Sequence, residues 1–413
     1  MTLPAIALPE NERREGLAAA RRELLRCEMV SDFGRLQELS SDWKRLWQSD
    51  PQAEIFQSPE WAVAWWSAFG HRYTLCSLVV FAADEVVGIV PLVKRNGVIQ
   101  FLGTPEADYA DIVCSEQWSS RVLVAAFQTL QESTTGWKEC CLQHLSENSR
   151  VLRHYRALPR PLLANVRCIT TEHYQIFLPG KDGAGFDSVL GKHHTKRIRN
   201  KLQKAGQVRF RQLDTQQEAK THLTNFFHHH VRRFAVTGRR SVYAARDPQQ
   251  FMSALVEEPG LRDRLRFGVL ELDDRPLAWY FGFEVNGKFL LYQHTFDLDA
   301  AGYTPGEVLL WNLLAYSRDH FIREFDFGSG DELYKNRFSN ASRETFSIFI
   351  QPRSFAGRVR GVVRSTQNYV QPLLRGMKKK VKSRATMRAL RSVRRWKIAA
   401  SARMKKTDEN GAR

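Results

Sequence analysis

The sequence predicts an α/β protein, of the α+β kind, in which two related halves each carry a mixed sheet flanked by helices. The chain has 413 residues, of which 43% are apolar and 26% charged, as in folded domains that bury one large or two moderate cores. Each half has the same predicted order, with helices first and then a β-hairpin, a further strand and a helix. Because no repeat of fixed period accompanies this order, the similarity of the halves is architectural.

Polar stretches and charge divide the chain into four parts. These are an N-terminal extension at 1–30, a first half at 31–165, a second half at 170–352 and a basic tail at 353–413. The tail carries 19 Lys and Arg against two acidic residues, whereas the other 352 residues carry 43 basic and 42 acidic ones. The formal net charge of +18 therefore belongs to the tail, and the folded body is nearly neutral.

The tail also has Leu390, Val393 and Trp396 among its many cations. This pattern suits a basic amphipathic helix on an anionic lipid surface, and equally a segment that binds nucleic acid nonspecifically or a disordered solubilising tail. We favour lipid slightly, so peripheral contact with an anionic membrane through 353–413 is expected before contact with nucleic acid.

Cysteine spacing and hydropathy predict the compartment. The six Cys show no Cys/His ligand spacing, and consecutive histidines such as those at 228–230 point in different directions on a helix, so no metal site is expected. No apolar run of about 18 residues exists, and the first residues resemble no signal peptide. We therefore expect a cytoplasmic protein, with the inner face of the membrane as its one peripheral location.

The first half is predicted from its apolar spacing and capping residues. Residues 33–47 form a helix with Leu and Trp on one face. A second helix begins with Ser58 as N-cap and Pro59 as its first residue, and its tryptophans are expected in the core. The later elements are a hairpin at 75–82 and 86–94, a helix at 121–131 and a strand at 139–145.

The second half opens with a short strand and a strongly basic helix. Its predicted elements are a strand at 174–178, the basic helix at 192–204, a strand at 208–213, helices at 218–234 and 247–257, a hairpin at 265–272 and 275–285, and a last strand at 344–350.

The stretch 289–335 completes this half and holds the best functional candidates. A buried strand at 289–296 precedes a short loop, a helix at 307–320 and a return strand at 324–327. Pro305 suits a first helical turn, and Gly306 leaves the N–H groups of that turn open to an anion.

Polar residues follow the return strand, at the end of the sheet where open α/β sheets bind ligands. They are Asp326, Asp331, Tyr334 and Lys335, all within ten residues. On the preceding strand, Tyr292 and His294 are two residues apart and are expected to share one face, where a histidine could act as a base. A satisfied core histidine and a carboxylate that caps a loop are the plainer alternatives for His294 and Asp326.

The residues of this stretch resemble the motifs of a known protein family. The chain is similar to the CelD/BcsL-type acetyltransferases of cellulose biosynthesis, a branch of the GNAT superfamily whose architecture is close to that of the FemAB aminoacyltransferases. The similarity covers about 54–350, is most specific from 185 to 336, and rests on the motifs Tyr292-x-x-x-x-x-Asp297, Tyr303-x-Pro305-Gly306, Phe325-Asp326-Phe327 and Gly330-Asp331-x-x-Tyr334-Lys335.

The resemblance implies two tandem GNAT-like acyl-CoA N-acyltransferase folds, of which the first is degenerate. Acetyl-CoA or another acyl-CoA would be the co-substrate, with its pyrophosphate at the start of the helix after Thr304. The implied residues are Tyr303, Pro305, Gly306 and Glu307 for the cofactor, Asp331, Tyr334, His294 and Asp326 for catalysis, and Lys335, Lys192, Arg197 and Arg199 for the substrate.

The implied activity is transfer of an acyl group to the nitrogen or oxygen of a sugar or sugar nucleotide in exopolysaccharide or envelope glycan synthesis. Asp331 or His294 would take the proton, and Tyr334 would protonate the thiolate. A FemAB-like transferase that uses aminoacyl-tRNA is an alternative, for which the basic helix would contact tRNA. A non-catalytic, membrane-peripheral assembly factor is another, because the loop before the helix has only Gly302 and Gly306 and no cation.

Overall fold

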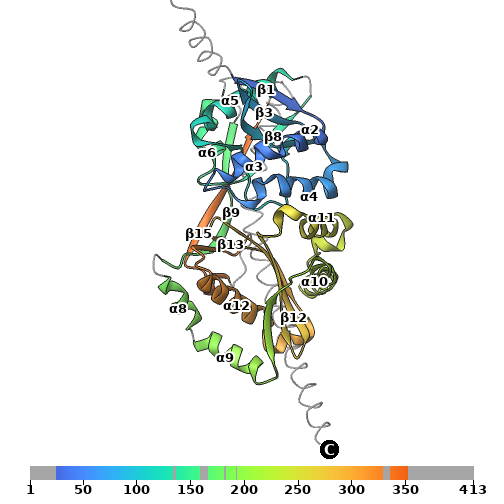
Figure 1. Cartoon of the computed structure of the whole chain (residues 1–413), viewed down its shortest axis with the longest axis vertical. Coiled ribbons are helices and arrows are strands. Elements are labelled where there is room, and N and C mark those ends of the chain that lie inside the picture. The colour runs from blue at the N-terminus through green and yellow to red at the C-terminus, as the bar shows by residue number, and fades with distance from the viewer. Residues whose placement is uncertain are drawn as a thin grey trace, which may run out of the picture. The chain divides into compact units, whose positions relative to one another are not determined.

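The computed structural model describes residues 25–133, 136–158, 166–180, 183–191, 193–328 and 335–351 (Figure 1). These residues form two compact units. Unit 1 holds the described residues up to 171, except 67–69, together with 344–351, and unit 2 holds 172–343 together with 67–69. In this part of the chain no helix is both long and apolar enough to cross a membrane.

Unit 1 contains two sheets. In the first, all neighbours are antiparallel and the order is β1 (Leu25–Val30), β3 (Ser77–Ala82), β4 (Glu85–Val90) and β7 (Val113–Cys114). In the second, the order is β15 (Ala341–Ile350), β8 (Glu139–Ser146), β6 (Val98–Phe101), β5 (Leu92–Arg95) and β2 (Thr74–Leu75).

The strand expected at 86–94 is broken, because β4 and β5 belong to different sheets and Pro91 lies between them. Proline has no N–H for a strand ladder, so a break at this residue is physically reasonable. Ser77 fixes the corner, since its hydroxyl donates to the Leu92 carbonyl at 3.1 Å and accepts from the Leu92 N–H at 3.0 Å.

The helices of unit 1 are α2 (Phe33–Glu38), α3 (Ser40–Gln48), α4 (Pro59–Phe69), α5 (Ser119–Glu132) and α6 (Arg150–His154). The helix expected at 33–47 is therefore two helices, which meet at Leu39. The predicted start of α4 is confirmed, since the Ser58 hydroxyl accepts from the Trp61 N–H at 3.1 Å and Pro59 is the first residue. Trp61 and Trp65 are fully buried, which confirms the core interpretation of this face.

Unit 2 is built on one sheet. Its order is β10 (Val208–Gln212), β11 (Leu265–Leu272), β12 (Arg275–Val285), β13 (Lys288–Phe296), β14 (Glu324–Asp326) and the second part of β9 (Val166–Phe177). All neighbouring pairs are antiparallel except β13 and β14, which are parallel. The hairpin of β11 and β12, the return strand and the basic helix were all predicted.

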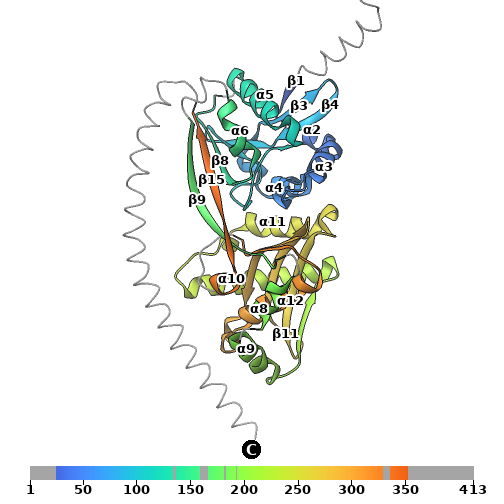
Figure 2. The same ribbon diagram turned by 90° about the vertical axis from the view of Figure 1, so that its left-hand side faces the viewer.

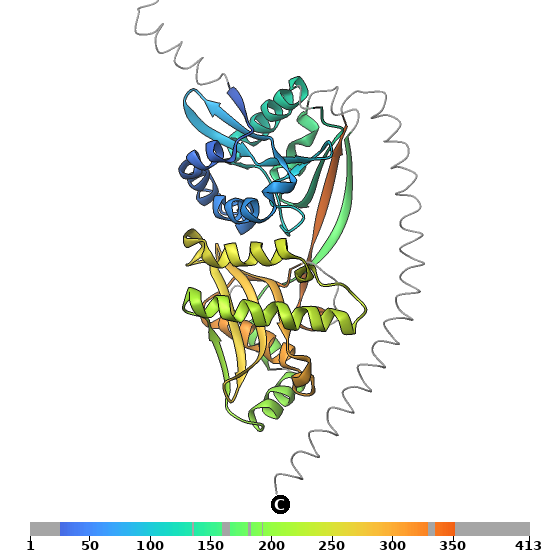
Figure 3. The same cartoon turned by 90° about the vertical axis from the view of Figure 1, so that its right-hand side faces the viewer.

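Helices cover both faces of this sheet, as Figures 1 and 3 show. One face carries α8 (Ala184–Leu190), α9 (His193–Gln203) and α12 (Pro305–Asp319), whose apolar side chains share one core with β12 and β13. The other face carries α10 (Gln216–Val236) and α11 (Arg246–Glu257), where the rings of Phe226 and Phe267 pack at 6.3 Å. A short helix, α13 (Lys335–Phe338), follows β14.

The two units share a topological core. In unit 1, the antiparallel pair β5–β6 leads through α5 to β8, which is parallel to β6. In unit 2, β12–β13 leads through α12 to the parallel strand β14. The predicted similarity of the halves is thus present in strand order, although the sequence has no repeat.

Each unit completes its sheet with a strand in which the chain crosses from one unit to the other (Figure 2). The chain leaves unit 1 within β9, which pairs with β14, and returns within β15, which pairs with β8. The last predicted strand, at 344–350, therefore forms, but its hydrogen-bonded partner β8 belongs to unit 1 and not to the second half.

Candidate active site

Strands β13 and β14 of unit 2 pair over a short distance only. Their parallel register runs from Lys288 opposite Glu324 to Leu290 opposite Asp326, where β14 ends. Strand β13 continues for six more residues, to Phe296. The edge of β13 beyond Leu290 therefore has no partner strand within the described residues, and an extended ligand has room to pair with it.

A β-bulge in β13 lies next to this divergence. Phe281 is opposite Gln293 and Phe283 is opposite Leu290, so Gly282 alone faces Leu291 and Tyr292. A Cβ on Gly282 would come within 2.4 Å of the Leu290 carbonyl oxygen, so only glycine fits here. Bulges interrupt the ladder and redirect side chains, and they are frequent beside active sites.

The bulge overturns the expectation that Tyr292 and His294 share a face. The Tyr292 ring lies 6.4 Å from that of Phe281, on the side of α10. His294 is instead opposite Tyr280, which belongs to the core shared with α12. Because directly opposed residues of antiparallel strands share a face, His294 lies on the α12 side. The rule that every second residue of a strand lies on the same face does not hold across a bulge, where one strand has an extra residue.

His294 occupies a cationic environment. Burial lowers its pKa well below the usual value, and the charges of Arg233 and Lys335 lower it further. The imidazole is therefore neutral at pH 7 and can accept a proton. Lys335, which is buried and donates to the Gly328 carbonyl at 3.1 Å, therefore lies near enough to His294 to affect its pKa.

Asp326 is buried at the end of β14, and its carboxylate is occupied. One oxygen accepts the Gly328 N–H at 2.8 Å, and the other lies 3.8 Å from Arg343, which also pairs with Glu324 at 2.9 Å. These contacts favour the loop-capping alternative for Asp326 over a direct catalytic part. The other two predicted catalytic residues, Asp331 and Tyr334, lie outside the described residues.

The start of α12 presents a backbone donor. Thr304 has a left-handed conformation (φ 51°, ψ 50°), and its carbonyl accepts the N–H groups of Glu307 at 3.0 Å and Val308 at 3.3 Å. Pro305 has no N–H, and the Gly306 N–H has no acceptor among the described residues. This donor lies at the positive end of the helix dipole, as an anion site requires.

Glycine suits position 306 for a further reason. A Cβ there would lie 3.3 Å from the ring of Phe296, at the end of β13, which is tighter than an ordinary contact. The side chain of Phe296 therefore needs a small residue at the second position of α12. This contact joins the end of β13 to the start of α12, where the cofactor was predicted to bind.

Cations reach this helix start from other elements. Arg337 pairs with Glu307 through two contacts, at 2.9 Å and 3.4 Å. Lys201 donates to the Gly302 carbonyl at 2.9 Å, and its ammonium is 5.8 Å from the ring centre of Tyr303. Neither residue was predicted, because neither lies in the loop before α12, where a cation for the pyrophosphate was expected. The only indication in the sequence was their position, since Lys201 comes two residues after Arg199 and Arg337 comes two residues after Lys335, both of which were predicted to bind the substrate.

The predicted substrate-binding cations on α9 do not act alike. Arg199 stacks on Trp311 of α12, with its guanidinium 4.1 Å from the ring centre, so it holds α9 on α12. Arg197 is exposed and has no hydrogen-bond or ion-pair partner in the described part of the chain, which leaves it available to a ligand. Lys192 lies outside the described residues.

In unit 1, a loop of the same chain occupies the edge beside the parallel pair. Strands β6 and β8 pair at Val98 and Ile99, and further along β8 the His144 carbonyl accepts the Ala110 N–H at 2.9 Å. The buried Asp111 anchors the loop, because its carboxylate accepts the N–H groups of Arg150 at 2.6 Å and Val151 at 3.1 Å. This edge is thus closed to an extended ligand.

The three consecutive histidines of α10 have separate surroundings. His230 contacts the Ser241 hydroxyl at 2.9 Å, His229 stacks on Trp279 at 4.8 Å, and His228 is exposed. Over the described ranges, no group of three His, Cys, Asp or Glu residues is placed to hold a metal ion.

Comparison with protein families assigns the second unit. Residues 191–336, which span β10 to β14 and the helices between them, match the acetyltransferase (GNAT) domain family. The matched segment is a GNAT acetyltransferase domain. It makes the protein an acyltransferase, and its co-substrate is an acyl-CoA. No curated protein matches the sequence significantly.

Two solved structures match the chain at low sequence identity. The crystal structure of FemX matches with a TM-score of 0.52 and 11% identity over 78% of this chain and 96% of that one. The C-terminal domain of a putative lysylphosphatidylglycerol synthetase from Agrobacterium fabrum matches at 0.49, with 12% identity over 78% and 95%. The FemX similarity and the GNAT match confirm the predicted fold class of mixed sheets flanked by helices.

Proposed function

We propose that this protein transfers an acyl group from an acyl-CoA to an amine or hydroxyl of a sugar or sugar nucleotide. The acceptor would be used in exopolysaccharide or envelope glycan synthesis, and the chain would belong to the CelD/BcsL-type branch of the GNAT superfamily. The sugar acceptor and the branch rest on the motifs at 292–335 and on the resemblance that they carry.

The divergence of β13 and β14 is the observation that carries the acyl-transfer part of this proposal. The pantetheine arm of the cofactor is extended and has amide groups, so it can pair with the edge of β13 beyond Leu290. The bulge at Gly282 would release a backbone N–H of β13 towards the developing oxyanion.

The pyrophosphate of the cofactor would lie at the start of α12. Its oxygens would accept the Gly306 N–H, with the positive end of the helix dipole behind it. Arg337 offsets the charge of Glu307 and, with Lys201, supplies the cations that the loop itself lacks. These two residues are added to the predicted cofactor-binding set.

In the reaction, the acceptor nitrogen or oxygen attacks the thioester carbonyl carbon and forms a new bond to it. His294 is available to take the acceptor proton, because its lowered pKa keeps it unprotonated near pH 7, although the same shift makes it a weaker base than an ordinary histidine. Collapse of the tetrahedral intermediate breaks the C–S bond, and the thiolate takes a proton from Tyr334. Asp331 is the second candidate for the base.

A second candidate, which rests on the resemblance to the FemAB aminoacyltransferases, is an aminoacyl-tRNA-dependent transferase, for which the exposed Lys196 and Arg197 of α9 would contact RNA. Phosphate contacts of that kind weaken steeply with salt. RNA that co-purifies with the protein and protects it from unfolding, with no response to acyl-CoA, would favour this candidate. A chain that binds neither ligand would be a non-catalytic assembly factor.

We also propose that the basic segment 353–413, which lies outside the described residues, holds the protein at an anionic membrane surface. Removing 353–413 should abolish sedimentation with anionic vesicles and leave the thermal unfolding of the body unchanged. A truncated chain that sediments as well as the full chain contradicts this part.

Thermal unfolding with and without millimolar acetyl-CoA tests the main proposal, because a ligand that binds only the native state raises the midpoint. We expect a clear shift in the wild type, its loss in Gly306→Glu and its retention in Tyr334→Phe, which should bind the cofactor but transfer slowly. Midpoints without ligand control for the fold of each variant. A wild type that no acyl-CoA shifts would overturn the proposal.

A further inference from the structure

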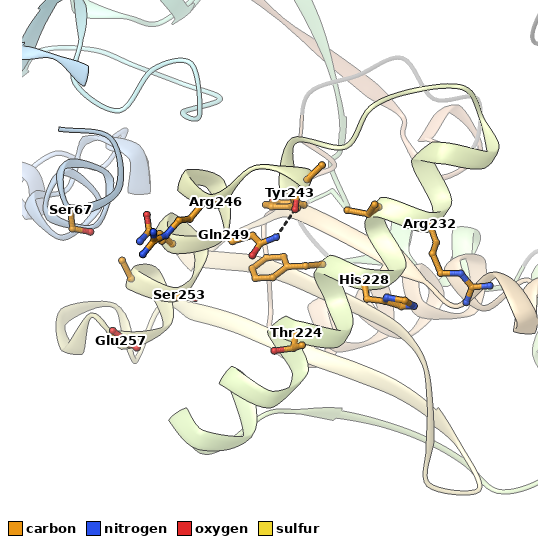
Figure 4. Close-up of a pocket in the computed structure, with 14 residues that line it drawn as sticks. Ser67, Thr224, His228, Arg232, Tyr243, Arg246, Gln249, Ser253 and Glu257 are labelled. Atoms are coloured by element: carbon orange, nitrogen blue, oxygen red, sulfur yellow. Dashed lines mark hydrogen bonds between the residues drawn. The ribbon is translucent and has the colours of Figure 1, made fainter. Parts of the chain in front are cut away.

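A groove lies between α10 and α11 of unit 2 (Figure 4). Its volume is about 1120 Å³, which exceeds the ~300–1,000 Å³ of ordinary ligand pockets. The acyl-transfer site described above depends on β13, β14 and α12, and none of the groove residues belongs to it. The groove is therefore a separate feature.

The groove is lined by regular stripes of two helices. On α10 the lining residues include Thr224, His228 and Val231, spaced four and three residues apart, whereas Phe226 and His230 of the same helix are buried. On α11 the stripe includes Arg246, Gln249, Gln250, Ser253 and Glu257. Residues with this spacing share one helix face, so the groove is part of the folded surface.

The floor of the groove is aromatic. Phe227 is half-buried, and its ring lies 5.1 Å from that of Tyr243, with 32° between the ring planes. Tyr243 is held in turn, because its carbonyl accepts the amide of Gln249 at 2.6 Å (Figure 4). A fixed aromatic floor beside polar side chains is a common design of ligand sites.

The walls carry hydrogen-bonding groups that the protein does not use. Within the described residues, the side chains of Thr224, His228, Arg246, Gln250 and Ser253 have no hydrogen-bond or ion-pair partner. The acidic Glu257 is neutralised by Lys220 at 2.7 Å, and Arg232 faces Asp299 at 3.3 Å. The remaining charge in the groove is therefore the positive charge of Arg246.

We propose that this groove binds an anionic saccharide of more than one sugar unit. The apolar face of a pyranose ring would pack on Phe227, its hydroxyls would bond with Gln250, Ser253 and Thr224, and a carboxylate would pair with Arg246. Charged–neutral hydrogen bonds and a guanidinium–carboxylate pair supply the selectivity for an acidic sugar. The groove would thus hold an acidic glycan at a distance from the acyl-transfer chemistry, so its binding does not require acyl-CoA.

Isothermal titration of the full chain, without acyl-CoA, tests the proposal. The probe is a tetrasaccharide that alternates glucuronic acid with N-acetylglucosamine, and chitotetraose is the neutral comparison of equal length. We expect the acidic probe to bind at least about tenfold more tightly than chitotetraose, and Arg246→Gln to remove most of that difference. Ser253→Phe, which fills the groove from an accessible position, should abolish binding of both probes.

Arg262→Gln is the matched control, because Arg262 is exposed and lies outside the groove. This variant should bind both probes as the wild type does. Absence of binding by the acidic probe, equal affinity for both probes, or wild-type affinity in Ser253→Phe would each overturn the proposal. An acetyl-CoA thermal shift on the same preparations separates the two sites. If acetyl-CoA raises the unfolding midpoint but the saccharide does not bind, only the groove proposal is wrong. If the saccharide binds but acetyl-CoA does not raise the midpoint, only the proposed acyl transfer is wrong.

Discussion

Arg337 of α13 and Glu307 of α12 form a paired contact, with guanidinium–carboxylate distances of 2.9 Å and 3.4 Å, although 30 residues separate them. The pair lies in the first turn of α12, beside the Gly306 N–H. Without Arg337, Glu307 would lose this neutralising contact at the place where the proposed cofactor carries its pyrophosphate. The contact thus reconciles an acidic first turn with an anionic ligand.

Arg337→Gln should weaken acetyl-CoA binding about tenfold, because it removes one cation and also exposes the charge of Glu307. Glu307→Gln should not weaken the binding, and this variant should bind acetyl-CoA at least as tightly as the wild type does. Titration calorimetry on both variants measures the effect, with the exposed Arg262→Gln as a control of equal charge change. Unaltered affinity in Arg337→Gln would remove this residue from the cofactor site.

His294→Gln should lower kcat by about 10²–10⁴-fold and leave the affinity for acetyl-CoA nearly unchanged, as expected for loss of a general base. In the wild type, kcat/KM should be flat near pH 7 and fall only at acidic pH, because the pKa of His294 is well below its usual value. Release of free thiol from acetyl-CoA, followed against pH, gives both results. A profile that His294→Gln leaves intact would point to Asp331 as the base.

One acetyl-CoA should bind per chain. Unit 1 has the same parallel strand pair, but its own Ala110 N–H occupies the β8 edge at His144. Calorimetric titration of the full chain should therefore give a stoichiometry near one. Two equivalent sites per chain would show that this loop leaves the edge when the ligand arrives.

Asp111→Ala should lower the stability of unit 1 by about 2–4 kcal/mol, since it leaves buried N–H groups without an acceptor. The same carboxylate also accepts the Ser149 hydroxyl at 2.9 Å. Urea unfolding followed by tryptophan fluorescence measures the change, and the exposed Glu147→Ala is the matched control. Equal midpoints for the two variants would contradict the anchoring part given to Asp111.

His230 should make the protein sensitive to acid. Burial lowers its pKa to about 3, so the folded state takes up its proton later than the unfolded state does. The unfolded state therefore binds more protons between about pH 6.5 and 3, and stability falls as the pH falls through this window. From pH 7 to 5 the loss from this residue is about 2 kcal/mol.

Between pH 7 and 5, the free energy of unfolding of His230→Gln should fall by about 2 kcal/mol less than that of the wild type. Urea unfolding at the two pH values measures the difference. The buried His222 and the half-buried His229 have lowered pKa values as well, so part of the acid sensitivity remains in the variant. His71→Gln, at an exposed position, should behave as the wild type. An equal loss in His230→Gln and the wild type would rule out this origin.

Local patterns in the sequence determined much of the fold. Ser58 and Pro59 start α4, and Pro305 starts α12, because capping and proline geometry act over a few residues. Apolar and aromatic runs located β11, β12, β13 and the return strand, and the density of Lys and Arg located the basic helix. Locally encoded features of this kind can be recognised without knowledge of the contacts between distant segments.

Tertiary structure decided the pairings and the neighbours. The bulge at Gly282 put Tyr292 and His294 on opposite faces, and register depends on two strands and not on one. The strand at 344–350 was visible as a strand, but its pairing with β8 was not.

The same reason explains the candidate site. The sequence by itself determined a glycine at a helix start and a histidine on the preceding strand, both from neighbouring residues. That Arg337 and Lys201 reach the start of α12, and that Lys335 lies near enough to His294 to affect its pKa, was decided by the tertiary structure alone. Such contacts join positions 30 to 101 residues apart, and no local pattern records them.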